Sequence, residues 1–191
     1  TAAEQQRLLR EVRERRELAT QLVDELSAAR DRLDRSVTAL ASGSSPGATG
    51  GPFARGLRVR PGGMAWPVPG RIESRFGRHP SSRFGTMVTR NGVDIGAEAG
   101  TAVTAVQSGT VAFADLFAGF GRVVILDHGA RAYTLYGHLA SIGVTKGAAV
   151  DAGAELGRVG TAPAGTPSLY FEVRIDGRPV DPVQWFKRQA P

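Results

Sequence analysis

Apolar and small residues recur every three or four positions along the first 40 residues, which is the period of one face of an α-helix. No Pro or Gly interrupts this stretch. In a heptad assignment, Leu26, Leu33 and Leu40 occupy one seam position, while Arg15 and Ser36 weaken the other. The pattern predicts a long coiled-coil helix over residues 1–40 that packs on a partner or on its own domain. A solvated linker helix is the alternative.

The composition changes twice after residue 40. Residues 41–63 contain seven Gly and three Pro, which is typical of a linker or regulatory arm without regular structure. From residue 64 to residue 191, short β-branched runs such as 102–106, 122–126 and 168–175 alternate with glycines. This spacing predicts an antiparallel β-sandwich or partly open barrel. The expected chain is therefore mainly β, with a helix, a linker and one β domain.

Charge and composition narrow the partners. The net charge of +6 and the pI near 10.6 favour anionic partners, but no basic cluster interleaved with aromatics is present, so we expect no nucleic acid. The absence of Cys excludes disulfides and thiolate metal sites. No apolar run approaches the roughly 20 residues that a membrane span needs.

Several motifs follow one another between Trp66 and Trp185. They are Gly70-Arg71-Ile72-x-Ser74-x-Phe76-Gly77, Asn91-Gly92-Val93-Asp94, Leu126-Asp127-His128-Gly129, Leu135-Tyr136-Gly137-His138 and Ser168-Leu169-Tyr170-Phe171-Glu172-Val173. In this order they resemble the LytM/lysostaphin-like zinc endopeptidases, which cleave peptide cross-links in bacterial peptidoglycan. The resemblance implies a LytM-like β domain at residues 64–191.

The resemblance also implies where zinc ligands should lie. The family takes them from His-x-x-x-Asp and from the last His of His-x-His, and the matching residues here are Arg90, Asp94 and Tyr170. Its two other site histidines correspond to His138 and Ser168. One carboxylate cannot hold catalytic zinc, which needs three protein ligands. We therefore expect no metal, no other cofactor and no catalytic residue.

Several polar residues in these motifs could have roles other than binding zinc. Ser168, His138 and Asp94 are suitable in type for a nucleophilic triad, but no Gly-x-Ser-x-Gly turn surrounds Ser168. Asp94 is expected to pair with Arg90. His79 and His128 lie in Gly-rich turn motifs, where we expect structural hydrogen bonds rather than a new metal site.

A frame without ligands resembles the EnvC-type murein hydrolase activators, in which a coiled coil precedes a degenerate LytM domain. The resemblance implies a noncatalytic activator of cell-wall N-acetylmuramoyl-L-alanine amidases in cell division, which binds the amidase's autoinhibitory helix in the former active-site groove. Carried over by position, the groove residues are Arg90, Asn91, Asp94, Phe120, Val123, Tyr136, His138, Ser168, Tyr170 and Arg174.

Further expectations concern regulation and place. By the resemblance, the coiled coil docks the protein to a membrane complex like an ABC transporter, in the periplasm or extracytoplasmic envelope, peripheral to the inner membrane. Residues 1–63 are the candidate for guarding the groove at rest. A peptidoglycan-binding or scaffolding module is the first alternative, and a residual peptidoglycan hydrolase is the second.

Overall fold

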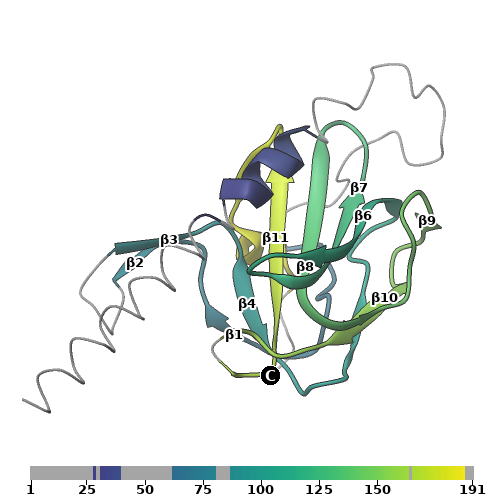
Figure 1. Ribbon diagram of the computed structural model, residues 1–191. Helices are drawn as coiled ribbons and strands as arrows, with labels where there is room; N and C mark the ends of the chain where they lie inside the picture. The colour runs from purple at the N-terminus through teal and green to yellow at the C-terminus, as the bar shows by residue number, and fades with distance from the viewer. Residues whose placement is uncertain (1–27, 29–30, 40–61, 81–86, 164, 188–191) are drawn as a thin grey trace, which may run out of the picture.

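The computed structural model describes residues 28, 31–39, 62–80, 87–163 and 165–187 (Figure 1). The chain is mainly β, as the sequence predicts, with an antiparallel sheet. Of the predicted coiled coil, residues 28 and 31–39 are described and are helical, and the remainder lies outside the described residues, as does most of the predicted linker. No helix in the described part of the chain is long and apolar enough to cross a membrane.

Ten strands form one sheet in which every named pairing is antiparallel. The main path runs β1-β4-β11-β8-β7-β6-β9, while β10 pairs with β8 and β5, and β12 pairs with β11. The strands are β1 (Arg71–Ser74), β4 (Val93–Gly96), β5 (Ala102–Thr104), β6 (Gly109–Phe117), β7 (Gly121–Asp127), β8 (Ala132–Ile142), β9 (Ala149–Val150), β10 (Glu155–Val159), β11 (Ser168–Ile175) and β12 (Arg178–Val180).

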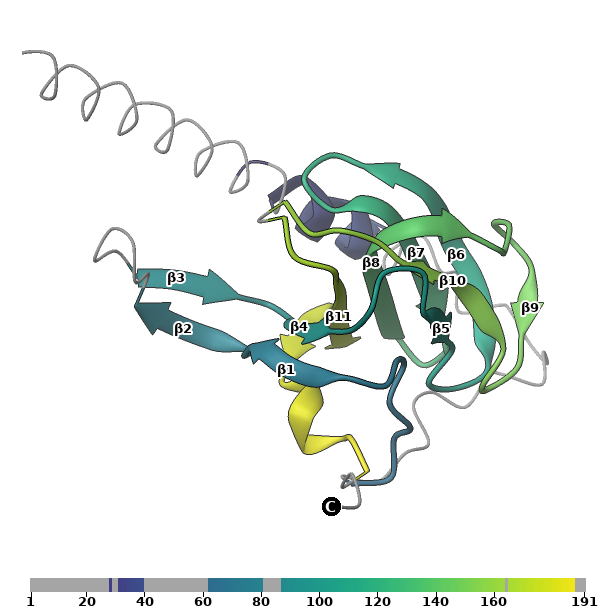
Figure 2. The ribbon, with the colours of Figure 1, turned by 90° about the horizontal axis from the view of Figure 1, so that it is seen from below.

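Strand β8 folds the sheet over on itself. Its residues 132–137 pair with β11, whereas residues 139–142 pair with β10 (Figure 2). The change of direction coincides with His138, whose φ of 60° is unusual for a residue with a side chain. The main core lies on the inner face, where Val124, Leu156 and Phe171 are fully buried.

Strand alternation gives the sheet two distinct apolar faces, because successive side chains point to opposite sides. On β11, Leu169, Phe171 and Val173 belong to the main core, whereas Tyr170 belongs to a second cluster on the outer face. Strands β7 and β8 alternate in the same way. Since both faces of these central strands are apolar, the outer face also needs a cover.

Two smaller elements flank the sheet. Strands β2 (Gly77–Pro80) and β3 (Met87–Arg90) form a separate hairpin that projects beside β1 and β4 (Figure 2). This hairpin delivers Arg90 to the start of β4. Near the C-terminus, the 3-10 helix η1 (Pro182–Gln184) begins at Asp181, whose carboxylate accepts a hydrogen bond from the Val183 amide at 3.0 Å.

Candidate helix-binding face

The second apolar cluster defines a docking face on the outer side of the sheet. It is contributed by the loop before β7 and by the alternate residues of β7, β8 and β11, namely Phe120, Val123, Ile125, Tyr133, Leu135 and Tyr170. All six are buried. The ring of Phe120 contacts Tyr170 with centroids 5.0 Å apart. All of these residues except Phe120 come from the central strands β7, β8 and β11, so their positions are fixed by the ladders on both sides.

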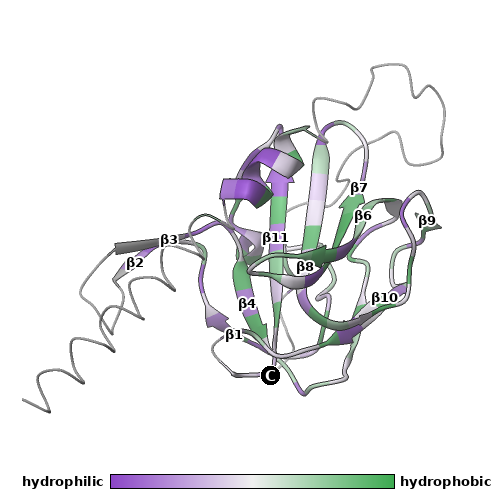
Figure 3. Ribbon diagram, viewed as in Figure 1, coloured by the Kyte–Doolittle hydropathy of each residue, from purple (hydrophilic) through white to green (hydrophobic). Residues whose placement is uncertain are grey.

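The helix at residues 31–39 covers this docking face. Figure 1 shows it lying across the ends of β11 and β8. Leu33 and Val37 join the cluster and are 1% and 0% exposed, although Asp31, Arg32 and Arg35 around them are exposed. Residues four apart lie on one face of a helix, so this pair forms a single apolar stripe. The largely hydrophilic colour of the helix in Figure 3 agrees with a narrow stripe.

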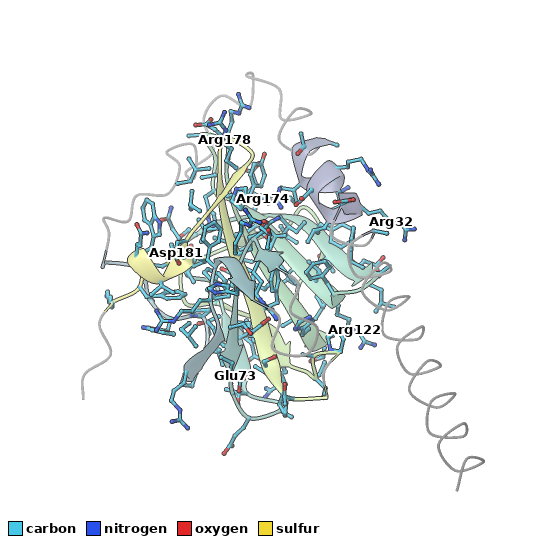
Figure 4. The ribbon with its side chains drawn as sticks, turned by 90° about the vertical axis from the view of Figure 1, so that its left-hand side faces the viewer. Arg32, Glu73, Arg122, Arg174, Arg178 and Asp181 are labelled. Carbon is cyan, nitrogen blue, oxygen red and sulfur yellow. The ribbon has the colours of Figure 1, made fainter. Side chains whose placement is uncertain are left out.

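A buried ion pair lies at the edge of the docking face. Arg174 and Glu172 are 2% and 0% exposed. The Nε atom of Arg174 donates to Oε1 of Glu172 at 2.5 Å, and the Tyr170 hydroxyl donates to the other oxygen of Glu172 at 2.5 Å. The other side of the guanidinium donates through its NH2 group to the carboxylate of Asp34 on the helix. Figure 4 shows Arg174 beside the helix that carries Arg32.

The protonation of this network follows from burial and from its partners. Burial raises the pKa of the Glu172 carboxyl above its ordinary value, while Arg174 and the Tyr170 hydroxyl oppose that shift. Burial lowers the pKa of Arg174, but Glu172 and Asp34 outweigh it and hold that pKa above its ordinary value. The guanidinium therefore stays charged. Glu172 takes up only the Nε edge of the guanidinium, and a buried NH2 donor without an acceptor is unfavourable, so the contact with Asp34 ties the helix to the sheet.

Asn91 and Asp94 lie on the β4 side of β11, where Asn91 approaches the same carboxylate of Asp34 as Arg174 does. The Asn91 side-chain amide donates to the two carboxylate oxygens of Asp34 at 3.3 and 3.5 Å. Asp94 is directly opposite Tyr170 across the β4–β11 ladder. The Arg90 guanidinium donates to Asp94 at 2.7 Å, which confirms the predicted pair. The Arg90 side chain is 40% exposed, so this ion pair contributes little to stability.

His138 packs beside the two contacting rings of Phe120 and Tyr170. Its ring lies 6.3 Å from that of Phe120 and 6.0 Å from that of Tyr170, between centroids. Burial lowers its pKa, Asp94 opposes that effect and Arg90 adds to it, so the neutral ring is favoured. The buried Nδ1 atom has no hydrogen-bond partner among the described residues.

The residues at the family's ligand positions do not fit zinc. Arg90 is a permanent cation that forms a salt bridge with Asp94, and the Tyr170 hydroxyl donates its hydrogen bond to Glu172. Within the described residues, no group of three or more His, Asp or Glu could hold a metal. Because catalytic zinc needs three protein ligands and an open position, this arrangement supports no metal-activated water.

The remaining predicted site residues divide between the two faces. Ser168 is buried and shares the strand parity of Tyr170, which places it on the outer side of β11. Tyr136 lies on the inner face in the main core, with its hydroxyl accepting a hydrogen bond from the Val106 amide at 3.1 Å. Burial raises the pKa of Tyr136 to about 12. The fold thus separates Tyr136 from the other nine residues.

Two histidines outside the face make the predicted structural hydrogen bonds. His79 Nε2 lies 2.9 Å from the Phe76 carbonyl oxygen. Fully buried His128 bridges the Ser108 carbonyl, 2.8 Å from Nδ1, and the Thr134 hydroxyl, 2.8 Å from Nε2. His128 therefore links the turn before β6 to β8.

Sequence reasoning missed several contributors to the docking face. Glu172 lies between Tyr170 and Arg174 in steps of two, so strand alternation alone could have identified it, and the same argument finds Ile125 from Val123. Asp34 carries no such signal, because its contact with Arg174 spans 140 positions. On the helix, the buried pair is Leu33 with Val37 rather than with the heptad neighbour Ser36.

Residues 88–182 match the sequence profile of peptidase family M23. The chain therefore carries a peptidase family M23 domain, which confirms the LytM-like resemblance. It is similar to the murein hydrolase activator EnvC of Escherichia coli K12, with 38% identity over 134 residues that cover 70% of this chain and 31% of that relative.

Two further proteins show the range of the family. The lipoprotein NlpD/LppB homolog of Pseudomonas aeruginosa is 34% identical over 146 residues, which cover 76% of this chain and 46% of that relative. The structure of a zinc containing peptidase from Vibrio cholerae superimposes with a TM-score of 0.58 at 29% identity. The match covers 70% of this chain and 41% of the peptidase chain. This chain spans less than half the length of each of these three proteins.

Proposed function

We propose that this chain is a noncatalytic activator of a cell-wall N-acetylmuramoyl-L-alanine amidase in cell division. It binds the autoinhibitory helix of the amidase on the docking face and so withdraws that helix from the amidase's own site. The observation that carries the proposal is the bound helix at residues 31–39, which buries Leu33 and Val37 and pairs Asp34 with Arg174. A face that accommodates one amphipathic helix is suited to another.

Two further observations support a role without catalysis. At the zinc-ligand positions, Arg90 and Asp94 form an ion pair with each other, and Tyr170 donates a hydrogen bond to Glu172. The relative EnvC is named for activating murein hydrolases rather than for hydrolysis. The names of the relatives, one of them a lipoprotein, also favour a location in the cell envelope.

The same helix supplies a means of regulation. Residues 31–39 and an amidase helix cannot occupy the docking face together, so the chain is inhibited while its own helix is bound. Residues N-terminal to the helix would form the coiled coil, and a membrane complex resembling an ABC transporter would act on it to release the face. Activation would then be confined to the division site where that complex works.

The test is dye release from labelled sacculi by this chain alone, by a candidate amidase alone, and by the two together. We expect release only in the mixture, and more of it from a variant with Leu33→Ala and Val37→Ala, which frees the docking face. Release by the chain alone, especially if a chelator stops it, would favour a residual hydrolase. No stimulation by the opened variant would contradict the activator proposal.

A peptidoglycan-binding or scaffolding module is the second candidate, favoured by the net charge of +6. It predicts that the chain sediments with isolated sacculi in the absence of an amidase. Binding that disappears at 0.5 M salt, where the Debye length is only about 4 Å, would indicate a nonspecific charge effect.

A further inference from the structure

We propose that the docking face selects its partner helix by a carboxylate, in the pattern apolar–acidic–x–x–apolar. Asp34 is the acidic position of the chain's own helix, and Leu33 and Val37 are the two apolar positions. This inference deepens the proposed function, because it specifies the helix that an amidase must offer. It rests on the contacts of residues 31–39 with β11 and with the turn before β4.

The first step is the geometry of Arg174. Its Nε edge is directed to Glu172, and its NH2 group is directed to Asp34 on the helix. Glu172 is itself held by the Tyr170 hydroxyl, so the guanidinium plane is fixed before any helix arrives. A partner with an apolar residue at this position would bury the NH2 group without an acceptor. The sheet thus requires an acceptor from the helix.

The second step is the convergence of two donors on one carboxylate. Asn91 reaches Asp34 from the turn before β4, whereas Arg174 reaches it from β11. Both donors are directed to the same oxygen, Oδ1, and the Asn91 amide also lies 3.5 Å from Oδ2. An Asn side chain could present one oxygen to both donors, but its NH2 group would then face the Asn91 amide, and it would offer no negative charge to the buried guanidinium. The pair therefore discriminates Asp from Asn, and not only polar from apolar.

The third step fixes the positions of the neighbours. Leu33 precedes Asp34 by one residue, and Val37 follows it by three, and both are buried in the docking face. Arg35 and Thr38 are exposed, so the face places no demand on those positions. The same distribution in a partner helix would bring its carboxylate to Arg174 when its apolar pair is seated.

The experiment measures fluorescence anisotropy with labelled 20-residue helical peptides whose centre copies residues 31–39. The receptor is the full chain with Leu33→Ala and Val37→Ala, which leaves the β domain intact and weakens its own helix. One peptide carries Asp34, a second carries Asp34→Asn, and a third carries Arg35→Gln as a control for a charge change on the exposed side. Circular dichroism checks that the three peptides have the same helicity.

We expect the Asp34→Asn peptide to bind at least about tenfold more weakly than its parent, since a hydrogen bond to a charged group is lost. The Arg35→Gln peptide should bind within about twofold of the parent, because a solvent-exposed charge contributes little. In a receptor that also carries Arg174→Lys, which loses the guanidinium fork, the preference for Asp should shrink. Asn91→Ala, at a partly exposed turn, should reduce the preference if Arg174→Lys impairs folding.

Equal affinities for the Asp34 and Asp34→Asn peptides would overturn the inference, and so would failure of every peptide to bind. The outcome is independent of the proposed function. A clear preference for Asp with no amidase activation would remove the activator proposal and leave the selection by carboxylate standing. Amidase activation without a preference between the peptides would do the reverse.

Discussion

Replacing Leu33 by Ala should release the helix at residues 31–39 from the docking face. Leu33 is 1% exposed and packs in the cluster that contains Phe120, Val123 and Tyr170. Leu→Ala changes in protein cores lower stability by about 2–5 kcal/mol. The undocked state here is an intact β domain with a free helix, so the face can partly rehydrate and the lower end applies.

A loss of about 2–3 kcal/mol corresponds to roughly a 30- to 150-fold fall in the ratio of docked to undocked chains. Hydrogen exchange reports this ratio directly, because the amides of a docked helix exchange only after local opening. Exchange of the amides in residues 35–39 should accelerate by that factor, while the central strands β7, β8 and β11 retain their protection.

Arg35→Ala is the matched control, since Arg35 lies in the same helical turn with its side chain exposed. It should change exchange by no more than about threefold, in line with the small effects of surface substitutions. If Leu33→Ala also stays within threefold of the parent chain, Leu33 does not hold the helix in place, and the reasoning from its burial is refuted.

Three further predictions concern stability and metal. Burial lowers the pKa of His128, so below about pH 6.5 the unfolded chain binds a proton at this residue more readily than the folded chain does. The free energy of unfolding should therefore fall as the pH drops below about 6.5. Urea titrations at about pH 7.5, 6.5 and 5.5 measure this slope, and its absence would count against a buried neutral His128. Asp94→Asn should lower the free energy of unfolding by less than about 1 kcal/mol, because its partner Arg90 is 40% exposed; a larger loss in urea titration would mean that the pair does more than a surface contact. Adding zinc or a chelator should leave the melting temperature unchanged, and an upward shift with zinc would show that a metal site exists after all.

Much of the fold could be predicted because it depends on local patterns. Glycines and β-branched runs locate the strands, and the ordered motifs between residues 66 and 185 identify the family. The pairing of Arg90 with Asp94 also follows from the sequence, since the two residues are four positions apart at the turn between β3 and β4. The loss of the zinc ligands can also be predicted from the sequence, because the ability to bind zinc depends on residue type.

The composition of the docking face was only partly predictable. The family motifs predict that both Tyr136 and Tyr170 line the groove. In the structure, however, Tyr136 points into the inner core and Tyr170 lies on the outer face. Which parity faces inward is decided by how β8 folds over to pair with β10. No single strand carries that information.

The sequence by itself determines that residues 31–39 are compatible with a helix and that residues 168–175 are compatible with a strand. Only the tertiary structure brings Asp34 to Arg174 across 140 positions of chain. The reason is physical: helical and strand patterns arise from neighbours a few residues apart, whereas a buried donor such as the Arg174 NH2 group is paired with whichever acceptor the folded chain brings to it.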